Sequence, residues 1–350
     1  MVSGVWLNSC YDSSALAAIL QKNQSKRIKT FTLDFENQRS NETIKANKIA
    51  EHLKTNHKSF HFSQKDAIQL LENMPDIFEV PMGDSSILSF LFMGQNIQDE
   101  VKILLTTESS DVLFGGYHSY LMALKLDAFT KRTPPYLRGV VNMMMKFTSS
   151  KTQEVLKGKH LLQKYQALNA CFTQAEIESL IINPQSHPFK EHKGDINLKT
   201  LLHDDLENYL PNNLLYKADK GLMYYGIDHR DAFLKAELIE YLSELDESWL
   251  IKGWQSKYML KKIANKHLPE SYINTRPEDH HIPLSSWLKT CFQPYIESYL
   301  TTEQLNKHQL FNIDEVLAIK KAFYHSGSLN LAKKVWLLLQ FQMWHQRWID

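Results

Sequence analysis

An alternation of strand-like and helical segments over the first third of the chain constrains the fold more than any other feature. Short apolar or period-two segments, typical of strands, occur at Val5–Leu7, Ile28–Phe35, Lys58–Phe62 and Val101–Thr106. Segments with helical spacing of apolar residues separate them, at Ser13–Lys22, Asn41–Lys54 and Gln64–Asn73. This order makes the strands parallel, because each connecting helix carries the chain back to the starting edge. The sequence therefore predicts an α/β fold, a parallel sheet with helices on both faces.

The character of the chain changes after about Tyr120, where helical patterns dominate. Two prolines within Lys131–Tyr136 interrupt any helix there. A chain of 350 residues, 43% of them hydrophobic, can bury the core of one large domain or two ordinary ones. We therefore expect an α/β part over residues 1–125 and a mostly helical part over residues 126–350.

Charge and cysteine content exclude several classes of protein. The formal net charge of +1 gives no reason to expect a nucleic-acid or membrane-surface partner. The three cysteines lie far apart and form neither a zinc spacing nor a disulfide framework, which fits a reducing compartment. No basic stretch precedes an apolar segment at the N-terminus, and the apolar runs are too short to span a bilayer. The sequence predicts a cytoplasmic protein.

A basic segment covers Lys131–Lys164, where Glu154 is the one acidic residue. Two interpretations stay open for this segment. It forms a solvated helical face, which is the ordinary role of a charge run, or it forms a contact surface for an acidic partner.

Polar side chains follow two of the expected strands. Asn8–Ser14 follows the first strand and contains Asp12, and Thr106–Asp111 follows the fourth and contains Glu108. The carboxyl ends of parallel strands meet at one edge of a sheet, where ligands bind in such folds. Carboxylates placed there suit a hard cation such as Mg²⁺ carried by phosphates. The alternative is that these acids only cap the starts of helices.

Together, in this order and separation, the two loops resemble signature motifs of the synthetase domain of glutamine-dependent asparagine synthetases. That domain belongs to the ATP-pyrophosphatase superfamily, whose fold is of the adenine nucleotide alpha hydrolase-like, HUP type. The resemblance extends over nearly the whole chain. Its further matches are Thr30–Phe35, Asp84-Ser85-Ser86, Leu210-Pro211, Ala218-Asp219-Lys220, Arg230 with Phe233-Leu234, and Gly253, Lys257 and Leu260.

The resemblance implies a function and a set of site residues. ATP and aspartate would give β-aspartyl-AMP and pyrophosphate, and ammonia would then displace AMP. Asp12 and Asp111 would hold Mg²⁺, and Glu108 would be the catalytic group that deprotonates the attacking ammonia. The remaining positions implied in nucleotide binding are Leu7 and Leu33 beside the adenine, Ser13 and Ser14 on phosphate oxygens, Thr106 and Thr107, and Asn8 in the phosphate loop.

Departures from the family pattern are concentrated at this site. The Ser-Gly-Gly of the phosphate loop is here Asn8-Ser9-Cys10, so Cβ atoms take space that phosphate would use or require torsions that favour glycine. Asp231-Ala232 replaces a hydrophobic-proline pair. A family Arg-Pro-Lys stretch is here Arg276-Pro277-Glu278-Asp279, which brings negative charge toward ATP. These changes predict weak binding of ATP.

The sequence leaves three interpretations of function open. The first is an amidating ligase of the asparagine-synthetase type that acts on aspartate or a related acid. The second is a pseudoenzyme used as a binding module, and the third is an adenylating cyclase that closes β-lactam or peptide rings. The glutaminase domain of the family, with its N-terminal cysteine, has no match here, because the earliest cysteine is Cys10. Either free ammonia or an ammonia-supplying glutaminase partner would then provide the nitrogen, or the chain would be the C-terminal part of a split or truncated gene product.

Overall fold

A five-stranded parallel sheet forms the centre of the protein. The computed structural model describes residues 2–35, 41–133, 149–185, 195–273 and 282–350. The strands follow the order β3-β2-β1-β4-β5, and every neighbouring pair is parallel. Their bounds are β1 (Ser3–Trp6), β2 (Lys29–Phe35), β3 (Asn56–Phe62), β4 (Ile103–Thr106) and β5 (Asp228–Asp231). The expectation of a parallel α/β sheet is confirmed.

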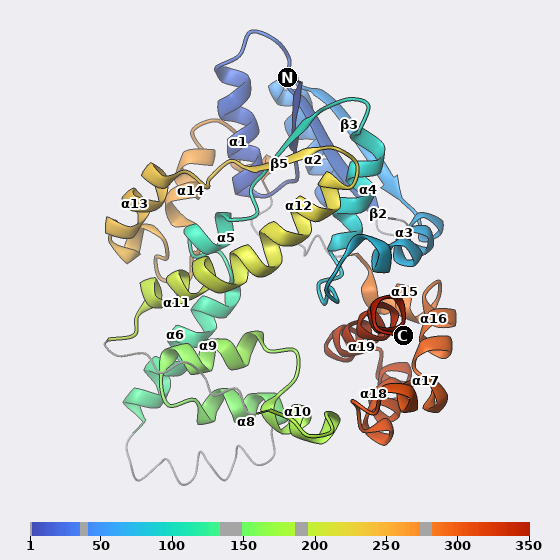
Figure 1. The fold of residues 1–350 in the computed structure, drawn as a ribbon. Helices are drawn as coiled ribbons and strands as arrows, with labels where there is room; N and C mark the ends of the chain where they lie inside the picture. Colours follow the sequence, from blue (N-terminus) through green and yellow to red (C-terminus); the bar gives the residue numbers. More distant parts are fainter. Residues whose placement is uncertain (1, 36–40, 134–148, 186–194, 274–281) are drawn as a thin grey trace.

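Helices cover both faces of this sheet (Figure 1). Successive strand residues face opposite sides, so Val5 packs into one hydrophobic cluster and its neighbour Trp6 into the other. The first cluster includes side chains of α1 (Tyr11–Lys22) and α2 (Asn41–Leu53). The second includes α3 (Gln64–Ile77), α4 (Ile87–Ile97) and α12 (Tyr216–Met223). Both faces are thus shielded from water, as parallel sheets require.

The remainder of the chain is mostly helical. The helices α5 (Ser110–Leu113) and α6 (His118–Arg132) follow β4, and α15 (Leu284–Lys289) to α19 (Leu329–Trp348) pack beside α3 near the C-terminus (Figure 1). No helix of the described ranges is both long and apolar enough to cross a membrane. The other helices are α8 (Ser150–Lys157), α9 (Leu161–Asn169), α10 (Gln174–Leu180), α11 (Leu198–Asp204), the π-helical η1 (Asp205–Leu215), α13 (Ala236–Glu244), η2 (Glu247–Trp249), α14 (Tyr258–Ala264), η3 (Glu270–Tyr272), α16 (Gln293–Tyr299), α17 (Thr302–His308) and α18 (Ile313–Ser326).

One strand of the sheet comes from the second part of the chain. The segment Asp228-His229-Arg230-Asp231 has no apolar alternation, so no strand is predicted there from periodicity. It nevertheless pairs in parallel with β4 at the edge of the sheet. The proposed division at residue 125 stays a prediction, but the two parts share one sheet.

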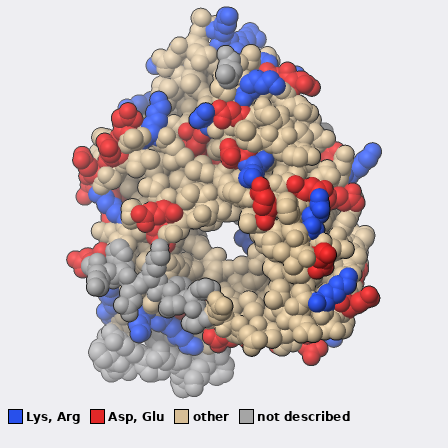
Figure 2. All heavy atoms as spheres, viewed as in Figure 1, with Lys and Arg blue, Asp and Glu red and all other residues tan. Residues whose placement is uncertain are grey.

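The basic segment is partly described. Residues 134–148 lie outside the described residues. Lys164, at the end of the segment, is 3% exposed and pairs with Asp127 at 2.8 Å. This lysine is therefore part of the interior rather than of a solvated face. Over the face of the molecule shown in Figure 2, acidic and basic side chains are interspersed.

The strand order reverses direction between β1 and β4. From β1 the chain moves to β2 and β3 on one side, and it then returns to place β4 and β5 on the other. The helices that follow β1 and β4 leave the sheet at this point, which opens a crevice at the carboxyl ends of the strands. Both loops singled out from the sequence, Asn8–Ser14 and Thr106–Asp111, border this crevice.

Candidate functional site

A cleft of about 360 Å³ lies at the carboxyl ends of β1 and β4. Most site residues implied by the resemblance line it, namely Asn8, Asp12, Leu33, Thr106, Thr107, Glu108 and Asp111. Leu7, Ser13 and Ser14 do not line it, since each is at most 1% exposed and lies behind the cleft wall. The structure thus brings the acidic residues of two distant segments into one cavity.

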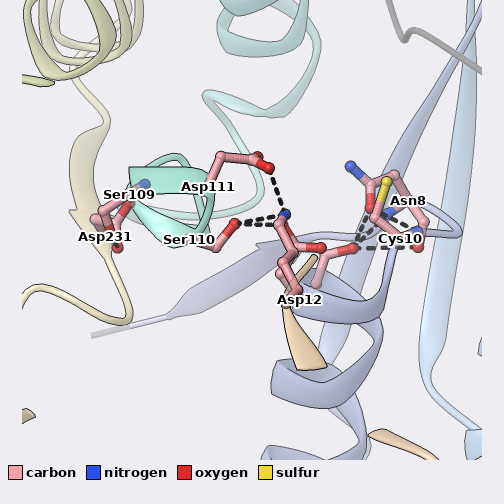
Figure 3. Close-up of polar contacts among 9 residues, drawn as sticks. Asn8, Cys10, Asp12, Ser109, Ser110, Asp111 and Asp231 are labelled. Atoms are coloured by element: carbon pink, nitrogen blue, oxygen red, sulfur yellow. Dashed lines mark hydrogen bonds and ion pairs between the residues drawn. The ribbon is translucent and has the colours of Figure 1, made fainter. Parts of the chain in front are cut away.

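Asp12 and Asp111 meet at the side chain of Lys257, which precedes α14. The Lys257 ammonium lies 3.0 Å from Asp12 Oδ2 and 2.8 Å from Asp111 Oδ1. The Ser110 hydroxyl donates to Asp12 Oδ2, and Lys257 donates to Ser110 Oγ at 3.2 Å. Figure 3 shows Asp12, Ser110 and Asp111 facing one another across the gap between the two loops. The two carboxylates therefore lie on the same edge and point into one site, as expected.

Lys257 offsets the mutual repulsion of the two carboxylates in this cluster. Burial favours the neutral form of Asp12, but the Lys257 ammonium and the Ser110 hydroxyl outweigh burial and lower its pKa. Burial raises the pKa of Asp111, and the nearby Asp12 charge adds to this effect. Burial also disfavours the Lys257 ammonium, yet the two carboxylates outweigh it and raise the pKa of Lys257. The lysine is therefore the counter-ion of an otherwise repulsive carboxylate pair.

The backbone at this cluster is arranged around Lys257. Its φ of 51° and ψ of 36° place it in the left-handed region, which is unfavourable for a residue with a side chain. Gly116 lies against the pair, and a Cβ built on it would overlap Asp111 Oδ1 and Lys257 Cε. The glycine is thus required for the close approach of Lys257 to Asp111.

The cluster is compatible with a Mg²⁺ ion that arrives with phosphates. Asp12 Oδ1 is buried and has no hydrogen-bond partner, so one carboxylate oxygen is available as a ligand. Among the described residues, no three His, Cys, Asp or Glu side chains converge on a metal position. Two carboxylates alone leave most ligand positions to phosphate and water oxygens, which is the usual arrangement for Mg²⁺. Asp12 and Asp111 are the residues that would hold the ion.

A second charged cluster surrounds Glu108 in the same cleft. Lys217 of α12 donates to Asp84 Oδ2 at 2.7 Å and to Ser86 Oγ at 2.8 Å. Its ammonium lies 3.9 Å from Glu108 Oε2. Burial raises the pKa of Glu108 to about 7, since the attraction of Lys217 is offset by the charges of Asp231, Asp84 and Asp111. Near neutral pH this carboxyl group can therefore either accept or donate a proton.

Asp231 of β5 fixes the turn that carries Glu108. Its carboxylate accepts the Ser109 backbone N–H at 2.7 Å, the Ser109 hydroxyl at 2.5 Å and the Phe233 N–H at 2.9 Å. Sequence reasoning identified Asp231 only as a departure from the family pattern. The available signal was Asp231 itself, a carboxylate where the family pattern has a hydrophobic residue.

The phosphate loop adopts ordinary backbone torsions despite its lost glycines. Cys10 has φ −76° and ψ 158°, and Ser9 is not among the described residues with positive φ. The backbone is therefore not strained at these positions. Cys10 lines the cleft, whereas Ser9 is fully buried, so only Cys10 takes space on the ligand side. Glu278 and Asp279, the other departures with an expected charge effect, lie outside the described residues.

Comparisons with known proteins identify similar chains. The family model described as asparagine synthase matches residues 4–346. The chain is 24% identical to asparagine synthetase [glutamine-hydrolyzing] 1 of Bacillus subtilis, over 98% of this chain and 55% of that protein. It is 25% identical to asparagine synthetase [glutamine-hydrolyzing] of Brassica oleracea, over 69% of this chain and 42% of that protein. The chain spans about half the length of the curated relatives it matches.

Proposed function

The chain belongs to the asparagine synthase family, and from this premise we propose that it is an ATP-dependent ligase that converts a carboxylic acid into an amide. The acid would attack the α-phosphorus of ATP, pyrophosphate would leave, and ammonia would displace AMP from the acyl-adenylate. Aspartate is the proposed acid, because the curated relatives are named as asparagine synthetases. The nitrogen would come from ammonia, free or released by a glutaminase partner.

The observation that supports this proposal most strongly is the convergence of Asp12, Asp111 and Lys257 at the edge between β1 and β4. Adenylation develops negative charge on the departing pyrophosphate, so catalysis depends on fixed positive charge. Lys257 supplies a permanent ammonium at this edge, because its raised pKa keeps it protonated at neutral pH. When bound, Mg²⁺ would neutralise further phosphate charge.

Glu108 is the proposed acceptor of the proton that ammonia loses as it attacks. A general base works best when its pKa lies near the working pH, and burial raises the pKa of Glu108 to about 7. The Lys217 ammonium lies 3.9 Å from the Glu108 carboxylate and favours its ionised form, which can accept a proton. Asp231 holds the turn in place through Ser109.

Exchange of labelled pyrophosphate into ATP tests the proposal directly. We expect slow exchange that requires aspartate and Mg²⁺ and is lost in Asp111→Asn. Asp228→Asn is the matched control, because Asp228 lies outside the cleft and pairs with Arg230 at 2.7 Å. The ligase proposal would be contradicted if no carboxylic acid supported exchange in the unmodified chain.

A binding module without catalysis is the second candidate function. Its support is the phosphate loop, where donors that could hold an anion are already paired within the chain. This candidate predicts saturable nucleotide binding without pyrophosphate exchange. The ring-closing alternative also predicts exchange that requires a carboxylic acid, but its product forms without ammonia. Product analysis with and without ammonia therefore separates it from the ligase.

A further inference from the structure

The phosphate loop contains a side chain that occupies its own hydrogen-bond donors. The Cys10 backbone N–H donates to Asn8 Oδ1 at 3.1 Å, and the Ser13 hydroxyl donates to the same oxygen. Ser13 Oγ in turn accepts the Asn8 backbone N–H at 3.1 Å. Figure 3 shows the dashed contacts gathered beside Asn8 and Cys10. The Cys10 N–H can only donate, so the amide atom that it meets is the oxygen, and the Ser13 hydroxyl then donates to that oxygen.

These donors are the groups that an anion would use. Cys10 immediately precedes α1, where backbone N–H groups point outward and the helix dipole favours negative charge. Asn8 lines the cleft, whereas Ser13 is 1% exposed and lies behind the cleft wall, so a ligand in the cleft meets Asn8 before the Ser13 hydroxyl. The nearby Asp12 Oδ1 is buried without a hydrogen-bond partner, so the same site retains an unused ligand position for a cation.

We propose that Asn8 determines the anion affinity of this loop, because its carboxamide oxygen takes the place of a phosphate oxygen against Cys10 N–H and the Ser13 hydroxyl. A phosphate then binds only after the Asn8 side chain rotates away and gives up both hydrogen bonds. The nucleotide site is thereby weakened by an internal competitor rather than by backbone strain. This inference rests on the proposed function, since it assigns the loop to a phosphate group.

Calorimetric titration with inorganic pyrophosphate and Mg²⁺ tests the inference on the full chain. Asn8→Ala and Asn8→Ser remove the competing oxygen, and we expect each to bind pyrophosphate at least tenfold more tightly than the unmodified chain. Asn8→Asp keeps the shape and adds negative charge, so it should hold the donors more strongly and bind pyrophosphate more weakly than the unmodified chain. Asn23→Ala is the control, because Asn23 is exposed at the other end of α1 and donates only to Ile19 O.

Hydrogen exchange of the Cys10 amide gives a second readout that needs no ligand. We expect faster exchange in Asn8→Ala than in the unmodified chain and no change in Asn23→Ala. Equal pyrophosphate affinity in the unmodified chain and Asn8→Ala, or Asn8→Asp behaving as Asn8→Ala, would overturn the role of Asn8 while leaving the phosphate site in place. No pyrophosphate or ATP binding in any variant, including Asn8→Ser with Cys10→Gly, would overturn both this inference and the proposed function.

Discussion

Lys257 is the residue on which the geometry of the candidate site depends most. Its ammonium lies within 3.0 Å of carboxylates from two loops that are about a hundred residues apart in the sequence. Two buried carboxylates without a counter-ion repel each other and shift their pKa values upward. The left-handed backbone of Lys257 is unfavourable, but it places the ammonium where it stabilises both carboxylates.

Replacement of Lys257 by methionine should destabilise the protein by about 3–5 kcal/mol, because it leaves two buried charges uncompensated. Mg²⁺ should recover part of this loss in the variant, since the freed carboxylates can then bind the ion. Thermal unfolding with and without MgCl₂ measures both effects. Lys266→Met, an exposed change just beyond α14, should leave stability nearly unchanged. A Lys257→Met variant as stable as the unmodified chain would refute the counter-ion role.

Glu108 gives a pH dependence whose sign is fixed by its raised pKa. The folded protein holds this proton up to about pH 7, whereas the unfolded chain releases it near 4.5. Folded stability therefore falls as the pH rises from about 4.5 to 7, because the folded state binds more protons in that window. Glu108→Gln removes this loss and should be about 1–3 kcal/mol more stable than the unmodified chain at pH 8. At pH 4 the difference should vanish, and unfolding curves at both pH values check this.

At the scale of elements, the hydrogen bonds between β5 and the start of α5 position the turn that carries Glu108. Asp231 accepts both the backbone N–H and the hydroxyl of Ser109, which immediately precedes α5. This arrangement matches a helix cap supplied from another strand rather than from the residue at the helix start. The edge strand β5 thus contacts the candidate site through the Asp231 carboxylate.

Asp231→Asn should reduce stability by about 1–2 kcal/mol, because the cap loses its charge-assisted hydrogen bonds. It should also lower the pKa of Glu108, since one nearby negative charge is removed. Titration of the Glu108 carboxyl by ¹³C NMR measures the pKa. Asp228→Asn, in the same strand, should leave that pKa unchanged. An unaltered or higher pKa of Glu108 in Asp231→Asn would show that Asp231 does not act on it.

Elements with a strong periodic pattern could be predicted from the sequence, and those without one could not. The predicted strand Ile28–Phe35 was observed as Lys29–Phe35, and the predicted helix Asn41–Lys54 as Asn41–Leu53. β5 was missed because Asp228–Asp231 is short and polar and therefore has no apolar pattern. It lies at the edge of the sheet, where short strands with charged side chains are common.

The same limit applies to the candidate site. The acids after β1 and β4 were predicted together, because the strand order alone brings them to one edge. Lys257 and Lys217 were not assigned to the site, since their positions depend on how distant helices pack. The role of Asn8 as an internal acceptor also required side-chain geometry. The carboxylates of the site could thus be identified from local sequence patterns. Their lysine counter-ions could be identified only from the tertiary structure.

At the scale of the whole molecule, the two parts of the chain contribute opposite charges to one cleft. The first part supplies Asp12, Glu108 and Asp111, and the second supplies Lys217 and Lys257. The second part also supplies β5 and the α12 side chains that cover one face of the sheet. We therefore expect folding of the first part to depend on the second.

A fragment of residues 1–125 should fail to fold alone, because it lacks a strand, part of the sheet's apolar cover and both counter-ions. Circular dichroism and limited proteolysis of the fragment, compared with the full chain, test this expectation. A protease-resistant fragment with a cooperative unfolding transition would instead show that residues 1–125 form an independent domain.

Calorimetric titration with Mg·ATP tests the central claim, that the cleft between β1 and β4 is a weakened nucleotide site. The unmodified chain should bind with a dissociation constant in the millimolar range or weaker, equivalent to about 4 kcal/mol or less. Asn8→Ser should bind at least tenfold more tightly, and adding Asp111→Asn should abolish that gain. Micromolar binding by the unmodified chain would contradict the weakened site, and tight binding that survives Asp111→Asn would place the nucleotide elsewhere.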